Sequence, residues 1–157
     1  MGLDLQGPTP RGIIARPILQ NQNNARAMKI LQPPGWLQPR GYSNGVAARG
    51  TTVSVAGQVG WDEQCRFQTD DFAGQTRQAL QNVVAVLAEA GAKPEHIVRM
   101  TWYLTDRREY LLRGKEIGAV FRELIGSFNA AMTAVQVSAL IEDRAKVEIE
   151  VTAVIPD

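Results

Sequence analysis

Residues that commonly build metal centres and nucleophilic sites are scarce in this sequence. Among 157 residues there is one cysteine, Cys65, and one histidine, His96. A single cysteine cannot form an internal disulfide or a cysteine-based zinc site, and a single histidine excludes a His–His metal motif. A Ser–His or Cys–His catalytic site would have to include His96 itself. The chemistry of this chain must therefore come from other side chains.

The sequence also lacks an excess of one charge and any long apolar run. Seventeen Lys and Arg residues balance sixteen Asp and Glu residues, so the net charge is +1 and we expect no nucleic-acid partner. Apolar runs span only a few residues, so we expect no membrane partner either. The composition is that of an ordinary globular protein, with 45% hydrophobic and 21% charged residues. The absence of a recognisable targeting signal predicts a cytoplasmic location.

The first 27 residues differ in composition from the rest. Six of them are Gln or Asn, and three prolines interrupt any helix. We interpret residues 1–27 as a disordered leader, natural or artificial. Residues 28–157 are then a single folded domain of ordinary size.

Apolar residues recur at helical spacing in two segments. The clearer pattern predicts a helix over 71–90, with Asp70 or Asp71 at its start and Gly91 just beyond its end. A second helix is predicted from residue 106 to Gly126.

Strands are predicted where apolar and polar residues alternate with a period of two, over 97–104, 132–139 and 146–155. Two shorter extended runs, 42–47 and 51–56, flank a turn that contains glycine and predict a β-hairpin. An extra short strand is compatible with the segment near residue 29.

The resulting order, β-β-α-β-α-β-β, predicts a two-layer α+β sandwich. Both helices must cover the same face of the sheet in order to bury their apolar stripes. The other face then carries polar and charged residues beside apolar ones: Arg99, Thr101, Gln136, Glu148 and Glu150. Such a face meets either solvent or a second subunit, and the thin two-layer body favours subunit contact.

Two groups of residues on this scaffold could serve a function. Glu148 and Glu150 are two residues apart on one strand face, where paired carboxylates can separate their pKa values and leave one as a general base. A solvated strand face explains the same pattern. The three tryptophans, at positions 36, 61 and 102, can line a site for a planar ligand or pack in a core or interface. The residues alone leave these alternatives open.

Five motifs follow one another along the chain: GYSNGV (41–46), VAGQV (55–59), QTRQALQNV (75–83), VQV (135–137) and VEIEVTAV (147–154). As an ordered set they resemble the RidA/YjgF family of reactive-intermediate imine and enamine deaminases. The resemblance covers residues 28–155. It implies a chorismate-mutase-like fold, in which two helices cover one face of a mixed sheet. It also implies a homotrimer with clefts between neighbouring subunits, and hydrolysis of 2-imino or 2-enamino acids without a metal or cofactor.

The same resemblance implies roles for particular residues. Glu150 would position or activate the attacking water, and Tyr42 would line the cleft. Main-chain groups near Gly57 and Ala134 could hold a substrate oxygen. The family has a cysteine where this chain has Ala134, a serine or threonine at Ala56, and an asparagine at about Gly114, which we include among the substrate-binding positions.

The most informative departure is Met132, which stands where the family has an arginine that binds the substrate carboxylate. Methionine has neither a charge nor a hydrogen-bond donor. Loss of a charge-assisted contact of about 1.5–3 kcal/mol weakens binding about tenfold to a hundredfold or more. Lys115, Arg99 or Arg113 could bind the substrate carboxylate in place of the family arginine, and the sequence leaves this open.

These departures favour a divergent hydrolase that acts on a small imine, enamine or related C=N compound other than the usual 2-imino acid. One alternative is a non-catalytic trimer whose clefts bind a small molecule. Another is an endoribonuclease, against which the near-zero net charge and the absence of a second histidine argue.

Overall fold

A computed structural model describes residues 28–127 and 129–157 of the chain. These residues form six strands and three α-helices. The leader predicted for residues 1–27 lies outside the described residues. The elements are β1 (Met28–Leu31), β2 (Gly45–Ala48), β3 (Thr51–Val59), α1 (Phe72–Glu89), β4 (Ile97–Leu104), α2 (Arg107–Leu112), α3 (Gly114–Leu124), β5 (Ala131–Gln136) and β6 (Val147–Ile155). A short 3-10 turn, Pro94–His96, precedes β4.

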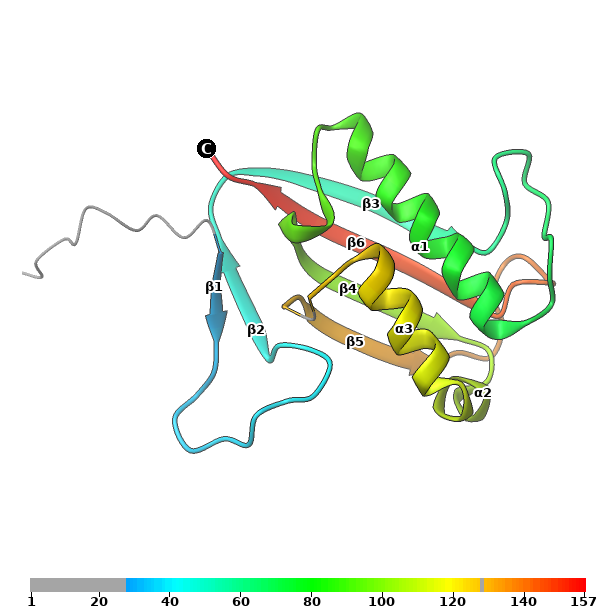
Figure 1. Cartoon of the computed structure of the whole chain (residues 1–157), viewed down its shortest axis with the longest axis horizontal. Helices are drawn as coiled ribbons and strands as arrows, with labels where there is room; N and C mark the ends of the chain where they lie inside the picture. Colours follow the sequence, from blue (N-terminus) through cyan, green and yellow to red (C-terminus); the bar gives the residue numbers. More distant parts are fainter. Residues whose placement is uncertain (1–27, 128) are drawn as a thin grey trace, which may run out of the picture.

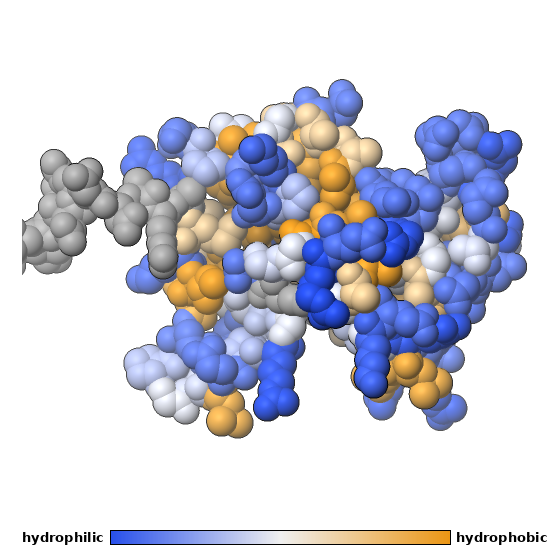
Figure 2. Space-filling model, viewed as in Figure 1, coloured by the Kyte–Doolittle hydropathy of each residue, from blue (hydrophilic) through white to orange (hydrophobic). Residues whose placement is uncertain are grey.

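A four-stranded mixed sheet in the order β3-β6-β4-β5 forms one layer. Strand β6 is antiparallel to both of its neighbours, and β5 is parallel to β4. Helices α1 and α3 lie side by side across one face of this sheet (Figure 1). The predicted two-layer α+β sandwich is thereby confirmed. Hydrophilic side chains cover much of the helix side, with smaller apolar patches between them (Figure 2).

The predicted β-hairpin between 42–47 and 51–56 is wrong. Strand β2 pairs instead with β1, which confirms the extra strand near residue 29, and β3 pairs with β6. Strands β3 and β6 have nine residues each, whereas β2 has four, so β6 offers β3 a partner of its own length. Local alternation identifies extended runs but does not determine which runs pair.

The first helix confirms its prediction in detail. The Asp71 carboxylate accepts a hydrogen bond from the Gly74 amide at 2.9 Å, and Gly91 adopts a φ of 69° beyond the C-terminus. The predicted second helix is interrupted at Arg113, which ends α2 and begins α3 with φ −91° and ψ 11°. The Arg113 guanidinium group bonds to Asp71 at 2.6 Å and to Glu116 at 2.8 Å, so side chains at the start of α1 and in the first turn of α3 hold the break.

The core lies between the helices and the sheet, and the predicted faces largely hold. The inward residues of β6 are buried as expected, as are Met100, Trp102 and Leu104 of β4. Strict alternation along 97–104 predicts that Ile97 shares the outer face with Arg99, and this is wrong, because a register shift between the two residues accompanies burial of Ile97 in the core.

Gln75 is a fully buried polar residue on α1 that the apolar pattern did not reveal. Its side-chain amide donates to the carbonyls of Thr69 at 3.0 Å and Arg144 at 2.9 Å. Its carbonyl oxygen accepts from the Lys146 amide at 2.8 Å. One side chain therefore satisfies three main-chain groups and fixes α1 to the segments before α1 and before β6.

The face of the sheet away from the helices is polar, as predicted, with one exception. Gln136 was expected on this face, but it pairs in register with Leu104 and lies on the helix side. There its side-chain oxygen accepts from the Arg107 amide at 3.0 Å, at the start of α2. Strand β5 also ends at Gln136, three residues earlier than predicted. In the part of the chain that the structure describes, no helix is long and apolar enough to span a bilayer.

Candidate functional site

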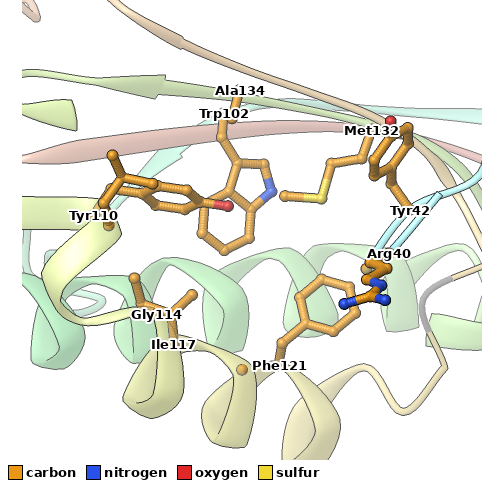
Figure 3. Close-up of a pocket in the computed structure, with 12 residues that line it drawn as sticks. Arg40, Tyr42, Trp102, Tyr110, Gly114, Ile117, Phe121, Met132 and Ala134 are labelled. Carbon is orange, nitrogen blue, oxygen red and sulfur yellow. The ribbon is translucent and has the colours of Figure 1, made fainter. Parts of the chain in front are cut away.

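A cavity of about 430 Å³ opens on the helix side of the sheet, a size typical of small-molecule sites. The segment before β2, strands β4 and β5, and helices α2 and α3 each contribute to its wall (Figure 3). Its lining is mostly apolar or aromatic and comprises Arg40, Gly41, Tyr42, Trp102, Tyr110, Leu111, Gly114, Ile117, Gly118, Phe121, Met132 and Ala134.

Three aromatic rings form much of the wall. The Trp102 ring lies 6.2 Å from Tyr110, edge to face, and 6.4 Å from Phe121. Burial of the Tyr110 phenol raises its pKa above the ordinary value, so this side chain is neutral at physiological pH. Trp102 and Phe121 are buried and form an uncharged base beneath the cavity, whereas the partly exposed Tyr110 is the ring that a ligand can reach.

Met132 extends from β5 toward the indole ring of Trp102 (Figure 3). The Trp102 indole nitrogen is buried and has no hydrogen-bond partner within the described residues. The methionine thereby contributes an apolar and flexible side chain at the position where the resemblance implies an arginine. Gly114 begins α3, and a Cβ atom there would meet no described atom within 4 Å, so this position leaves the cavity open.

Arg40 is a charged cavity residue that no motif indicated. Of the described residues that line the cavity, Arg40 alone carries a charge. The three cationic residues considered as substitutes for the carboxylate-binding arginine do not line the cavity. Arg99 lies on the opposite face of the sheet, Arg113 is held by Asp71 and Glu116, and Lys115 is absent from the described lining.

Glu150 lies on the opposite face of the sheet from this cavity. The Tyr103 hydroxyl donates a hydrogen bond to Glu150 Oε1 at 3.1 Å, and this bond raises the pKa of Tyr103. A shallow hollow of about 200 Å³ surrounds the carboxylate and is lined by Ser54, Val55, Arg99, Thr101, Glu150, Val151 and Thr152. The Thr101 hydroxyl is buried there without a hydrogen-bond partner in the described part of the chain.

Gly57 lies on the same face of the sheet as Glu150. It lies on β3 at a register shift between Val55 and Gln58. A Cβ atom at Gly57 would collide with the Glu148 carboxylate, so glycine permits the close approach of this acidic side chain.

The predicted site residues thus divide into two groups. Residues that line the apolar cavity are Tyr42, Gly114, Met132 and Ala134. Glu150 and Gly57 lie across the sheet from them. Alternation along β4 explains this division, because Trp102 faces the cavity while its neighbours Thr101 and Tyr103 face Glu150. Among residues 28–127 and 129–157, no three His, Cys, Asp or Glu side chains form a possible metal-binding group.

Residues 37–155 match the model of the Endoribonuclease L-PSP family. The chain belongs to the RidA/YjgF family. A RutC family protein of Aquifex aeolicus is 31% identical over 129 residues, which are 81% of this chain and 99% of that protein. The 2-iminobutanoate/2-iminopropanoate deaminase of Salmonella typhimurium is 33% identical over 105 residues, 67% of this chain and 80% of that enzyme.

A solved structure extends the RidA/YjgF similarity to the fold. The Rid-family protein YyfB from Yersinia pestis superposes with a TM-score of 0.69 at 29% identity, over 82% of this chain and 99% of that one. The mixed sheet with helices on one face is accordingly the expected chorismate-mutase-like fold.

Proposed function

We propose that this RidA/YjgF-family protein hydrolyses a small imine, enamine or related C=N compound to a carbonyl compound and ammonia. One observation carries the proposal: most of the positions assigned by the resemblance line a single cavity, namely Tyr42, Gly114, Met132 and Ala134. The deaminase name of the Salmonella relative supports the reaction type.

We infer that the working site forms between subunits of a homotrimer. Glu150 and the apolar cavity lie on opposite faces of the sheet, so one chain does not bring them together. A cleft that contains both needs the cavity of one protomer and the Glu150 face of a neighbour. The buried, unpartnered hydroxyl of Thr101 and the charged Arg99 beside Glu150 are compatible with subunit contact on this face.

In the proposed reaction, water attacks the carbon of the protonated C=N bond while the Glu150 carboxylate accepts a proton from it, which gives a neutral carbinolamine. Glu150 then returns this proton to the amine nitrogen. The C–N bond breaks, and ammonia leaves as the hydroxyl group forms the carbonyl and releases its proton to solvent. The hydrogen bond from Tyr103 fixes the orientation of the carboxylate, and Tyr42 orients the substrate.

Met132 adapts the cleft to substrates other than the short-chain 2-imino acids. At this position it provides apolar surface and no donor for a carboxylate. We therefore expect weak turnover of 2-iminopropanoate and similar small acids.

The deciding experiment measures deaminase turnover of 2-imino acids generated in place by an amino-acid oxidase, with semicarbazide as the competing trap. Wild type, Met132→Arg and Glu150→Gln are compared. We expect Met132→Arg to raise turnover of 2-iminopropanoate about tenfold or more, since it restores a charge-assisted contact. Glu150→Gln should abolish the turnover of every substrate that wild type accepts, because the amide cannot take up the proton.

Unchanged turnover in Glu150→Gln would disprove the role of this carboxylate. If wild type and Met132→Arg both bind ligands but neither hydrolyses any imine, the protein is the non-catalytic binding trimer instead.

A further inference from the structure

We propose that the apolar cavity selects substrates that combine an anionic group with a bulky apolar or aromatic body. Arg40 binds the anion at one end, and the body packs against the partly exposed side chains of Tyr110 and Met132. For the C=N chemistry above, this class is the aromatic 2-imino and 2-enamino acids. The reaction rests on the proposed function, whereas the binding rests on the cavity.

The shape and chemistry of the wall argue for a large apolar body. Tyr42, Tyr110, Leu111 and Met132 present accessible apolar surface, and the buried side chains of Trp102, Ile117 and Phe121 support them from beneath. Burial of an aromatic ring against such a wall is favourable in proportion to the apolar area removed from water. A two- or three-carbon substrate would leave most of this surface uncovered.

The charge at the end of the cavity argues for an anion. Figure 3 shows the Arg40 guanidinium group at the opposite end of the cavity from Tyr110. It forms no ion pair or hydrogen bond with any other residue that the structure describes. A guanidinium group presents paired N–H donors that match a carboxylate, so a free one at a cavity rim is suited to bind it.

The loop that carries Arg40 is held in place by its own hydrogen bonds. The Asn44 side-chain amide donates to Gln32 at 2.8 Å across the base of this loop, and Gln32 in turn donates to two carbonyls within it. The Ser43 amide donates to the Ala130 carbonyl at 2.9 Å, at the start of β5. Arg40 is therefore only three residues from Ser43, whose backbone is hydrogen-bonded to the segment just before β5. This short separation limits how far Arg40 can lie from the cavity.

The geometry of a 2-imino acid fits this arrangement. Its carboxylate and C=N carbon are directly bonded, so a carboxylate on Arg40 keeps the reacting carbon at the Arg40 end of the cavity. The side chain then extends along Met132 toward Tyr110. An arginine at position 132 would instead fix the carboxylate farther inside and occupy space that an aromatic side chain uses.

The test compares 2-imino acids derived from phenylalanine and alanine, with kcat and KM measured for each. We expect wild type to prefer the aromatic substrate by at least about tenfold in kcat/KM. Arg40→Gln should raise KM for the aromatic substrate about tenfold with little change in kcat, and Arg40→Lys should recover part of the loss. Arg49→Gln is the matched control, because Arg49 is an exposed arginine outside the cavity whose contact is Asp157.

Calorimetric measurement of phenylpyruvate binding separates this inference from the proposed function. Binding that weakens about tenfold in Arg40→Gln but not in Arg49→Gln supports the inference even if wild type hydrolyses no imine. Turnover without a preference for the aromatic substrate, or without an effect of Arg40→Gln, overturns it while the hydrolase remains. Absence of both binding and turnover overturns both.

Discussion

Tyr103 and Glu150 form a hydrogen-bonded pair whose state can be followed by titration. The bond to the carboxylate raises the pKa of Tyr103, since an ionised phenolate would lose the bond and face a negative charge. Because the folded pKa is raised, the stabilisation from this bond is complete below the ordinary tyrosine pKa near 10 and is lost as pH rises through the folded value. Stability at neutral pH is therefore unaffected by this titration.

Ultraviolet absorbance of the phenolate between pH 8 and 12 measures the effect. In wild type we expect Tyr103 to ionise above the ordinary tyrosine pKa. The Tyr103→Phe variant lacks this side chain, so the difference between the two absorbance titrations gives the contribution of Tyr103. Glu150→Gln should move that component to lower pH. Tyr110 is the internal reference, because burial rather than Glu150 raises its pKa. Identical midpoints in wild type and Glu150→Gln would show that the pair does not form.

Individual site residues were predictable only where they belong to a motif. Tyr42 lies within GYSNGV and Met132 is three residues before VQV, so the resemblance located both, and the structure places both in one cavity. Arg40 lies in an irregular segment between Pro39 and Gly41, where no periodicity applies. Its place beside β5 depends on the long-range tether of Ser43, which leaves no local trace in the sequence.

At the level of elements, the buried Gln75 of α1 is a test of how the helix is fixed to the sheet. Gln75→Leu keeps a similar volume but removes three hydrogen bonds between this buried side chain and main-chain groups. Each such bond contributes about 0.5–1.5 kcal/mol, so we expect a loss of about 2–4 kcal/mol in the free energy of unfolding.

Urea denaturation at one fixed protein concentration measures this loss. Gln81→Leu on the same helix is the control, because Gln81 is exposed and should change stability by less than about 0.5 kcal/mol. Equal effects of the two substitutions would contradict the structural role of Gln75.

Helices and strands with a clear apolar periodicity were predicted almost to the residue. The pairing of the strands was not predicted. The α1 stripe and the alternation in β4 and β6 reflect burial on one side, which the sequence records directly. The separation of β2 from β3 and the break at Arg113 depend on contacts with β1, β6 and Asp71, which are distant in the chain. Gln136 was misplaced because alternation gives two faces without saying which one the helices cover.

For the whole molecule, mixing of inactive subunits tests whether clefts are shared between protomers. Tyr42→Ala and Glu150→Gln homotrimers should both be inactive under the proposed function. After the two are unfolded together and refolded in equal amounts, roughly a quarter of the clefts combine an intact Tyr42 with an intact Glu150 from the neighbour. We expect recovery of about that fraction of wild-type turnover.

Light scattering measures the mass of the refolded assembly, which we expect to equal three chains, and each variant refolded alone is the control. If the mixture stays inactive although mixed trimers form, each chain must use its own Tyr42 and Glu150. A mass of one chain would refute the trimer.

The alternation of β4 also limits how this scaffold can change over evolution. Trp102 contacts the cavity, while Thr101 and Tyr103 line the opposite hollow, so one extra residue upstream in this strand would exchange the two sets. Strand β4 lines both sites, so we expect it to tolerate substitution more readily than insertion or deletion between Arg99 and Leu104. We expect changes in length in connecting segments such as residues 32–44, and Arg40 lies in that segment.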